Sequence, residues 1–194
     1  MIFGHASDLA TMIGESERQR AEVAQILASL STGQAHWRPS EQKWSVLGHV
    51  AHMCLVNESY TQAIDACIAK ARERGRLSKG PYKHGWFGRW FTRSMEPPPK
   101  RRWVTGKAMV PDPGLDGSEV GSRFEYVQGE LDRLMGDARG VDLGRARFSS
   151  PFVRVLHLSL GTGFSVLLAH NRRHIWLIRE VLAGDLFPVA EEGA

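Results

Sequence analysis

The sequence contains little cysteine, and this scarcity narrows the class of protein. Its 194 residues include two cysteines, Cys54 and Cys67, too few for a scaffold held together by disulfides. Both fall within one expected helix, where their separation corresponds to about 20 Å along the axis, so they cannot pair with each other. We therefore expect two buried, unreactive thiols.

Long apolar runs are also missing. No stretch approaches the roughly 20 apolar residues that a membrane-spanning helix needs. The first residues, Met1 to His5, lack the basic and apolar regions of a signal peptide. Hydrophobic residues make up 42% and charged residues 24%, which are ordinary globular values that exclude a disordered or low-complexity chain. We expect a cytoplasmic protein with a single domain over residues 1–194.

Charge is distributed unevenly, although the formal net charge is only +4. The segment from Lys70 to Lys107 contains twelve basic and two acidic residues, and the remainder of the chain is net negative. Glycine and proline are frequent in residues 73–116, which do not show the pattern of a core element. These residues are expected to form a long basic, aromatic-rich crossover, with a short amphipathic helix over 84–95.

Apolar residues at helical spacing predict four long helices, and no strand alternation is evident. The expected helices cover about 7–30, 46–72, 118–138 and 159–183, with Ser45 and Ser159 as N-caps. The fold class is therefore all-α, a four-helix bundle. The connection over 73–116 is long enough to let the second and third helices run parallel, which gives an up-down-down-up topology.

The crossover carries aromatic residues that need a partner. We expect Trp86, Phe87 and Trp90 to pack on the bundle, because leaving them in water would expose a large apolar patch. If they were exposed, a homodimer or a membrane contact would be favoured. The basic residues could instead bind nucleic acid, with the aromatic rings stacking on bases, or bind an acidic substrate through Arg89 or Arg93.

Two histidine pairs have a spacing that suits a metal. His170 and His174 are four residues apart and therefore share one face of the last helix, while His49 and His52 are three apart on the second. Such pairs are common by chance, and two packed or surface histidines are the ordinary explanation. The apolar residues 165–169 indicate, however, that this turn faces the bundle.

The combination of Trp44-Ser45, His52 eight residues after the tryptophan, and Leu-Leu-Ala-His170-Asn-Arg-Arg-His174 resembles the DinB-like/YfiT-like metalloenzyme superfamily. The resemblance implies a four-helix bundle with up-down-down-up topology and a mononuclear metal site of three histidines. By position, His52, His170 and His174 match the ligands. The family implies metal-dependent thiol transfer, hydrolysis or isomerisation on small molecules.

Three neutral imidazoles suit Zn²⁺, Ni²⁺ or Fe²⁺, and they leave an open position for water or a substrate atom. His49 is a weak candidate for a catalytic or proton-carrying group, and packing against Trp44 is its simpler interpretation. His157 is a weaker candidate still, and Glu58 falls off the ligand face. No convincing general base is evident. Gly161-Thr-Gly163 lacks the preceding strand of a dinucleotide-binding motif and is interpreted as a packing feature.

The leading interpretation is a metal-dependent enzyme of the thiol-transferase or hydrolase type, acting on a small molecule that is a thiol or an anion. The alternative is a non-enzymatic binding protein that uses the basic aromatic crossover on nucleic acid or on a protein partner. The two histidine pairs support the first, and the charge of the crossover supports the second.

Overall fold

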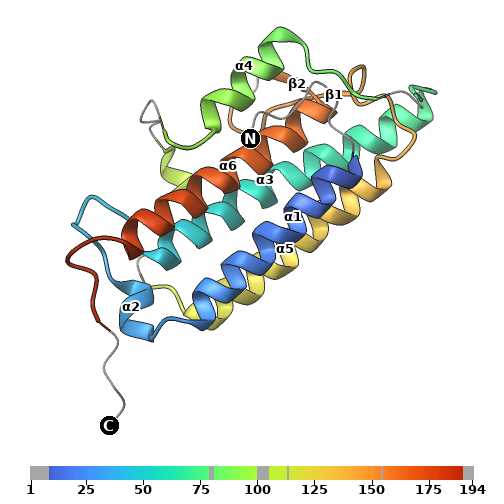
Figure 1. Cartoon of the computed structure of the whole chain (residues 1–194). Helices are drawn as coiled ribbons and strands as arrows, with labels where there is room; N and C mark the ends of the chain where they lie inside the picture. Colours follow the sequence, from blue (N-terminus) through green and yellow to red (C-terminus); the bar gives the residue numbers. More distant parts are fainter. Residues whose placement is uncertain (1–8, 79–80, 100–104, 113, 154, 190–194) are drawn as a thin grey trace.

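Four long helices form the body of the protein in a computed structural model that describes residues 9–78, 81–99, 105–112, 114–153 and 155–189. They are α1 (Leu9–Ala28), α3 (Val46–Glu73), α5 (Gly117–Asp137) and α6 (Leu160–Leu182), arranged as a bundle (Figure 1). In Figure 1, α3 and α5 run in one direction while α1 and α6 run in the other. The predicted up-down-down-up topology is thus confirmed.

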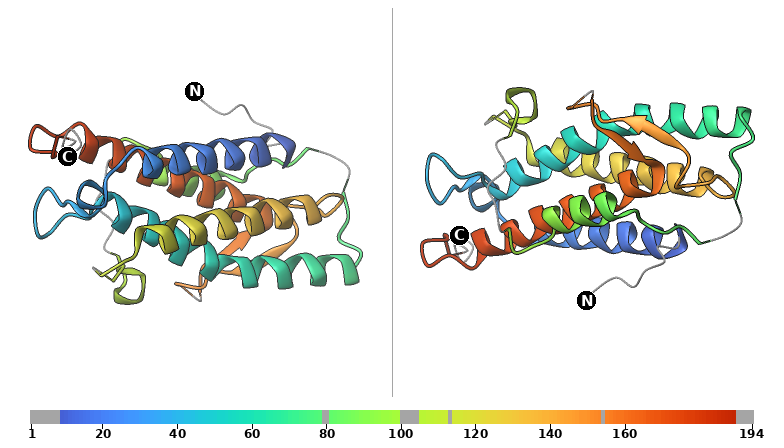
Figure 2. Two further views of the ribbon diagram at one scale, coloured as in Figure 1. Left: turned by 90° about the horizontal axis from the view of Figure 1, so that it is seen from below. Right: turned by 90° about the horizontal axis from the view of Figure 1, so that it is seen from above.

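The four helices pack around a common interior. α1 packs against α5 and α6, and α3 packs against the same two helices (Figure 2). Apolar side chains form one cluster towards each end of the bundle. Between them lies a layer of fully buried polar side chains, one from each helix. They are Ser16, Asn57, Gln128 and Asn171.

Capping side chains set where the helices begin. The hydroxyls of Ser45 and Ser159 accept hydrogen bonds from the backbone N–H groups of Gly48 and Thr162, so both predicted N-caps are confirmed. A short helix, α2 (Thr32–His36), was not predicted. Ser31 caps it with a capping box, a local signal that the prediction of four long helices did not use.

The crossover contains the expected short helix, α4 (Trp86–Met95), which packs along α6, and a 3₁₀ turn, η1 (Lys107–Met109). The expectation about its aromatic residues is only partly right. Phe87 and Phe91 pack against the core. Trp86 and Trp90 do not, because they lie on the opposite side of the helix and remain 74% and 52% exposed.

The connection between α5 and α6 contains two short strands that the sequence did not predict. It contains β1 (Arg147–Ser149) and β2 (His157–Ser159), which pair antiparallel with Phe148 opposite Leu158. Three residues are too few for alternation to be visible in a sequence. The inward side chains, Phe148 and Leu158, are buried, and the strands close one end of the bundle.

Glycines at the start of α6 allow these irregular segments to approach the helix. A Cβ on Gly161 would lie 2.4 Å from the ring of Tyr82, and one on Gly163 would lie 2.6 Å from the ring of Phe148. The interpretation of Gly161-Thr-Gly163 as a packing feature is therefore supported. None of the described helices is long and apolar enough to cross a bilayer.

Candidate metal centre

Three histidines from two helices converge inside the bundle. His52 comes from the first half of α3, and His170 and His174 come from successive turns of α6, which packs beside α3 (Figure 1). Each offers one ring nitrogen such that the three atoms lie within 4.8 Å of one another. The Nε2 atoms of His52 and His170 are 3.2 Å apart. The structure thus brings together the three residues that the sequence singled out.

A backbone carbonyl fixes the orientation of His52. Its Nδ1 lies 2.7 Å from the carbonyl oxygen of Met109, in η1. Because a carbonyl can only accept, Nδ1 carries the proton, and the Nε2 of the neutral ring presents its lone pair to His170. The crossover therefore contributes directly to the centre. A backbone acceptor has no side-chain signature, so the sequence could not have revealed this contact.

His174 is oriented by another histidine. The Nδ1 atoms of His49 and His174 are 3.0 Å apart, so one of them donates a hydrogen bond to the other. When His174 is the donor, its Nε2 is free to bind an ion. His49 also packs edge-on against Trp44, with ring centroids 5.5 Å apart, as the simpler interpretation of this residue expected.

Trp44 covers the cluster. Its indole centroid lies 4.7 Å from that of His52 and 6.0 Å from that of His174, where the two rings stack. An apolar residue just before an N-cap, as Trp44 is before Ser45, commonly packs on the following helix as a hydrophobic staple. The structure shows that the indole forms an apolar wall of the histidine cluster.

Burial keeps these imidazoles neutral. It lowers the pKa of His170 to about 3 and that of His49 to about 4, with a smaller contribution from the neighbouring His52 in each case. Burial likewise lowers the pKa of His52 and places that of His174 well below its ordinary value. At neutral pH all four rings are therefore uncharged, as metal ligation requires.

The donor set fits a divalent ion. Two imidazole nitrogens on one tetrahedral Zn²⁺ are about 3.3 Å apart, since each Zn–N bond is about 2.0–2.1 Å. The separation of 3.2 Å between His52 and His170 matches this value. Within the described ranges, no carboxylate or thiolate joins the three histidines in such a group. Three protein ligands leave a position open, which is the pattern of catalytic rather than structural sites.

The other sequence candidates lie outside the cluster. Glu58 forms an ion pair with Arg123, and His157 is exposed on β2, where it contacts Ser149. Arg89 and Arg93 are exposed on α4. A different arginine, Arg173, acts electrostatically on the centre: it is buried, and its positive charge contributes to the lowered pKa of both His170 and His174.

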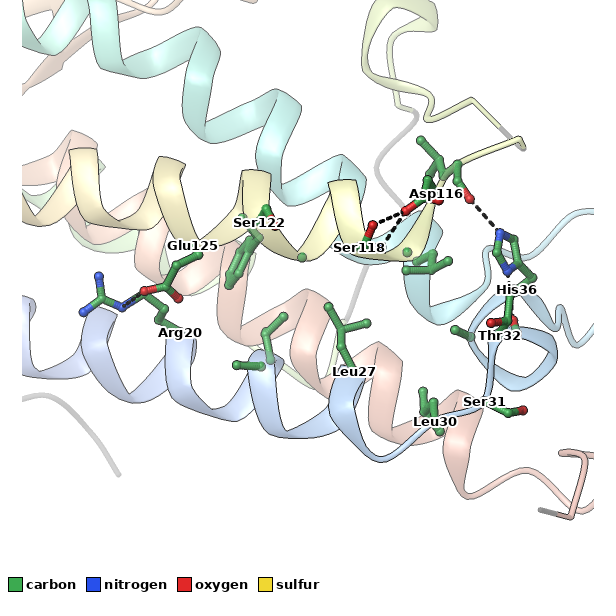
Figure 3. A pocket seen from close by; sticks show the side chains of 18 residues that line it. Arg20, Leu27, Leu30, Ser31, Thr32, His36, Asp116, Ser118, Ser122 and Glu125 are labelled. Carbon is green, nitrogen blue, oxygen red and sulfur yellow. Dashed lines mark hydrogen bonds and ion pairs between the residues drawn. The ribbon is translucent and has the colours of Figure 1, made fainter. Parts of the chain in front are cut away.

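A large cavity lies elsewhere. A hollow of about 780 Å³ opens between α1, α2 and the start of α5, with Leu27 and Leu30 on one side and the Arg20–Glu125 ion pair at one end (Figure 3). None of the three clustered histidines lines it. The histidine cluster is therefore identified by its donor atoms and not by the size of a pocket.

Comparisons with known proteins identify the family and support the fold. The family model of the DinB superfamily matches residues 15–178. A solved structure of YfiT from Bacillus subtilis, described as a probable metal-dependent hydrolase with an unusual four-helix bundle topology, covers 89% of this chain, and this chain covers 85% of YfiT. The two are 15% identical, with a TM-score of 0.55. No curated protein matches the sequence. Since the family model spans most of the bundle and all three histidines, the chain belongs to the DinB superfamily.

Proposed function

We propose that this protein is a metal-dependent enzyme of the hydrolase type, with His52, His170 and His174 as the ligands of one divalent ion. The observation that carries the proposal is the convergence of three neutral imidazoles from two helices. The description of YfiT as a probable metal-dependent hydrolase supports the reaction class. Zn²⁺, Ni²⁺ and Fe²⁺ all suit this donor set.

A divalent ion with an open position supplies Lewis acidity, which acidifies a nucleophile and stabilises developing negative charge. The residues of the chain have supporting roles. The Met109 carbonyl holds the proton of His52 on Nδ1, and His49 orients His174. Trp44 excludes water from one side of the cluster. We assign His49 as a positioning residue, because its hydrogen bond is made to a ligand of the ion.

The substrate is proposed to be a small anionic molecule. Arg173 is a buried cation close enough to the centre to affect two of its imidazoles, so the local potential favours negative charge. A low-molecular-weight thiol as co-substrate would make the protein a thiol transferase, the other reaction type that the family resemblance implies. Hydrolysis needs only water as the second reactant, whereas thiol transfer needs an added thiol. The two reaction types can therefore be distinguished by supplying or withholding a thiol.

Metal content tests the site. The protein, stripped with chelator and reloaded separately with Zn²⁺, Ni²⁺ or Fe²⁺, should retain about one ion per chain with at least one of them, measured by elemental analysis. His170→Ala should lose the ion, and His157→Ala is the matched control, because that histidine is exposed on β2. Equal metal content in wild type and His170→Ala would overturn the assignment.

Activity tests the reaction class. The reloaded protein should hydrolyse members of a panel of small anionic esters and amides, and chelator should abolish the reaction. Turnover that appears only when a small thiol and an electrophile are supplied together would identify a transferase. Metal binding with no turnover on either panel, at concentrations where a reference metallohydrolase is active, would contradict the enzymatic proposal while leaving the metal site intact.

A further inference from the structure

One side of the molecule exposes apolar side chains that the bundle does not cover. On α4, Trp86 and Trp90 are one turn apart, and they are 74% and 52% exposed. At the tip of the β1–β2 hairpin, Phe152, Val153 and Val155 are 43%, 49% and 86% exposed. Figure 1 draws α4 and the hairpin on the upper side of the bundle, and the view from above in Figure 2 shows both on the near side.

The two segments that carry these side chains contain basic but no acidic residues. The segments 81–95 and 144–159 contain no Asp or Glu. Their described residues include five exposed cations, Lys83, Arg89, Arg93, Arg145 and Arg147. On α4, Arg89 and Arg93 share the outward face with the two tryptophans, because residues three, four and seven apart lie on one face of a helix. We call this combination of residues 81–95 and 144–159 the basic-apolar face.

The two segments form one surface. A hollow of about 290 Å³ lies between them and is lined by Lys83 and Trp86 from one segment and by Arg147 and His157 from the other. Tyr82 also ties them together, since its hydroxyl is 2.8 Å from those of Ser159 and Thr162. No carboxylate lines the hollow. The exposed tryptophans and the basic strands are therefore held in a fixed relation.

We propose that the basic-apolar face docks on an anionic phospholipid bilayer. Cations would lie at the headgroups, while the indoles and the hairpin tip enter the interface. Exposed tryptophans suit the boundary between lipid headgroups and acyl chains, and nearby Lys and Arg side chains suit the anionic headgroups. Five cations beside five apolar side chains supply the two signals, electrostatic and hydrophobic, that stable peripheral binding needs.

Two other partners explain the face less well. A single-stranded nucleic acid would pair its bases with the indoles and its phosphates with the cations. It would leave Val153 and Val155 unused, since aliphatic side chains cannot stack on bases as rings do. A second copy meeting this face by a two-fold axis would bring two basic surfaces together, with no acidic residue within the two segments to compensate.

Vesicle sedimentation with the full-length, metal-loaded protein tests the proposal. Binding to vesicles of phosphatidylcholine with 30% phosphatidylglycerol should be at least tenfold tighter than to phosphatidylcholine alone, and it should weaken as salt rises. Trp86→Ala with Trp90→Ala, and separately Phe152→Ser with Val155→Ser, should each reduce binding at least tenfold. Arg89→Gln with Arg93→Gln should reduce it by up to about 25-fold, at about fivefold for each cation near the surface.

Matched controls come from α5 and the turn that follows it. Tyr126→Ala removes an aromatic ring that is 70% exposed, and Arg139→Gln removes an exposed cation, both outside the basic-apolar face. Neither should alter vesicle binding. Circular dichroism should show that every variant keeps its helices, and because this control needs neither metal nor turnover, the test is independent of the proposed function.

Three results would overturn the proposal. The first is equal binding to both vesicle types, or none to either at low salt. The second is tighter binding of a fluorescent 20-nucleotide single strand that the α4 variants abolish, which would identify a nucleic-acid surface. The third is a dimer in light scattering that the Trp86→Ala/Trp90→Ala variant converts to a monomer, which would identify a subunit interface.

Discussion

His49 illustrates how one side chain can matter to a metal site without binding the ion. Its Nδ1 contacts the Nδ1 of His174 at 3.0 Å, and so it controls where the proton of that ring resides. Outer partners of this kind typically change metal affinity about 10–100-fold. We expect His49→Phe, which keeps a ring against Trp44, to weaken metal binding by about that factor in a chelator competition titration.

The conservative variant separates positioning from packing. His49→Asn places a polar atom near the position of Nδ1 and should recover part of the lost affinity, although it has no ring to pack against Trp44. If His49→Phe binds metal as tightly as wild type, or if His49→Asn is the weaker of the two, His49 does not act through His174. Circular dichroism of each variant verifies that the helices persist.

The hydrogen bonds of His36 predict how its contribution to the free energy of unfolding changes with pH. Its two ring nitrogens lie 2.9 Å and 2.7 Å from the carbonyl oxygens of Thr32 and Leu115, so only the doubly protonated ring satisfies both. Those hydrogen bonds raise the pKa of His36. Because the pKa of His36 is higher in the folded than in the unfolded protein, protonation of the ring stabilises the fold. This stabilisation is complete at pH values below the unfolded-state pKa, near 6.5, and is lost as pH rises through the folded-state pKa.

The measurement is urea unfolding of wild type and His36→Gln from about pH 5.5 to 8.5. The difference in unfolding free energy should be largest at the acidic end and shrink towards pH 8.5. It should stay below about 1 kcal/mol, because the ring is partly exposed to water. The buried imidazoles of the metal centre act in the opposite direction, so only the difference between the two proteins isolates His36. A difference that grows with pH would contradict the assignment.

Among the secondary structure elements, the start of α6 is the place where the crossover and the hairpin meet the bundle. Gly161 faces the ring of Tyr82 so closely that an added Cβ would lie 2.4 Å from a ring carbon. Tyr82 is buried and hydrogen-bonded, so its ring cannot move away freely. We expect Gly161→Ala to destabilise the protein by about 1–3 kcal/mol, as overpacking does.

Gly136 supplies the matched control. It lies within α5, and among the described residues nothing lies within 4 Å of the point that a Cβ would occupy there. Gly136→Ala should be neutral or stabilising by up to about 1 kcal/mol, since alanine favours helix. The midpoints of guanidinium unfolding report both changes. Equal midpoints for the two variants would show that Tyr82 accommodates the extra methyl group.

The elements themselves differ in how far the sequence reveals them. The four long helices and the caps at Ser45 and Ser159 were predicted, because apolar periodicity and capping are local patterns. α2 and the two strands were not, since elements of five and three residues have too short a pattern. The sequence predicted that Trp86 and Trp90 pack on the bundle, whereas Phe87 and Phe91 do so. Both faces of α4 carry aromatic residues, and periodicity does not show which face contacts α6.

For the molecule as a whole, the length of the crossover allowed α3 and α5 to run parallel, and the family resemblance implied that they do. The three-histidine grouping followed from helical spacing together with the same resemblance. Spacing alone left the histidine pairs indistinguishable from packed residues. The contacts that complete the site, the Met109 carbonyl and the Trp44 wall, depend on tertiary packing between distant segments. A single sequence carries no local pattern for such contacts.

The buried polar layer is the tertiary feature that connects all four helices. The Gln128 carbonyl oxygen accepts from Asn57 at 2.8 Å and from Asn171 at 3.1 Å, and its amide donates to Ser16 at 3.3 Å. Removing Gln128 takes this acceptor from the Asn171 amide and leaves the Asn57 amide with only a 3.4 Å hydrogen bond to the Asn171 side-chain oxygen. A buried polar group left unsatisfied costs about 1–3 kcal/mol. We expect Gln128→Leu to lower the unfolding free energy by about 2–4 kcal/mol in guanidinium denaturation.

The triple variant Asn57→Leu/Gln128→Leu/Asn171→Leu tests what the layer does beyond adding stability. It removes donors and acceptor together, so it should regain part of the loss seen in Gln128→Leu. An apolar layer no longer distinguishes one helix register from another, because leucines pack in several ways whereas the hydrogen bonds require one alignment. The metal centre reports that alignment, since its ligands come from α3 and α6. The triple variant should therefore bind metal more weakly than wild type while unfolding at a higher guanidinium concentration than Gln128→Leu. Wild-type metal affinity in the triple variant would show that apolar packing alone sets the register of the bundle.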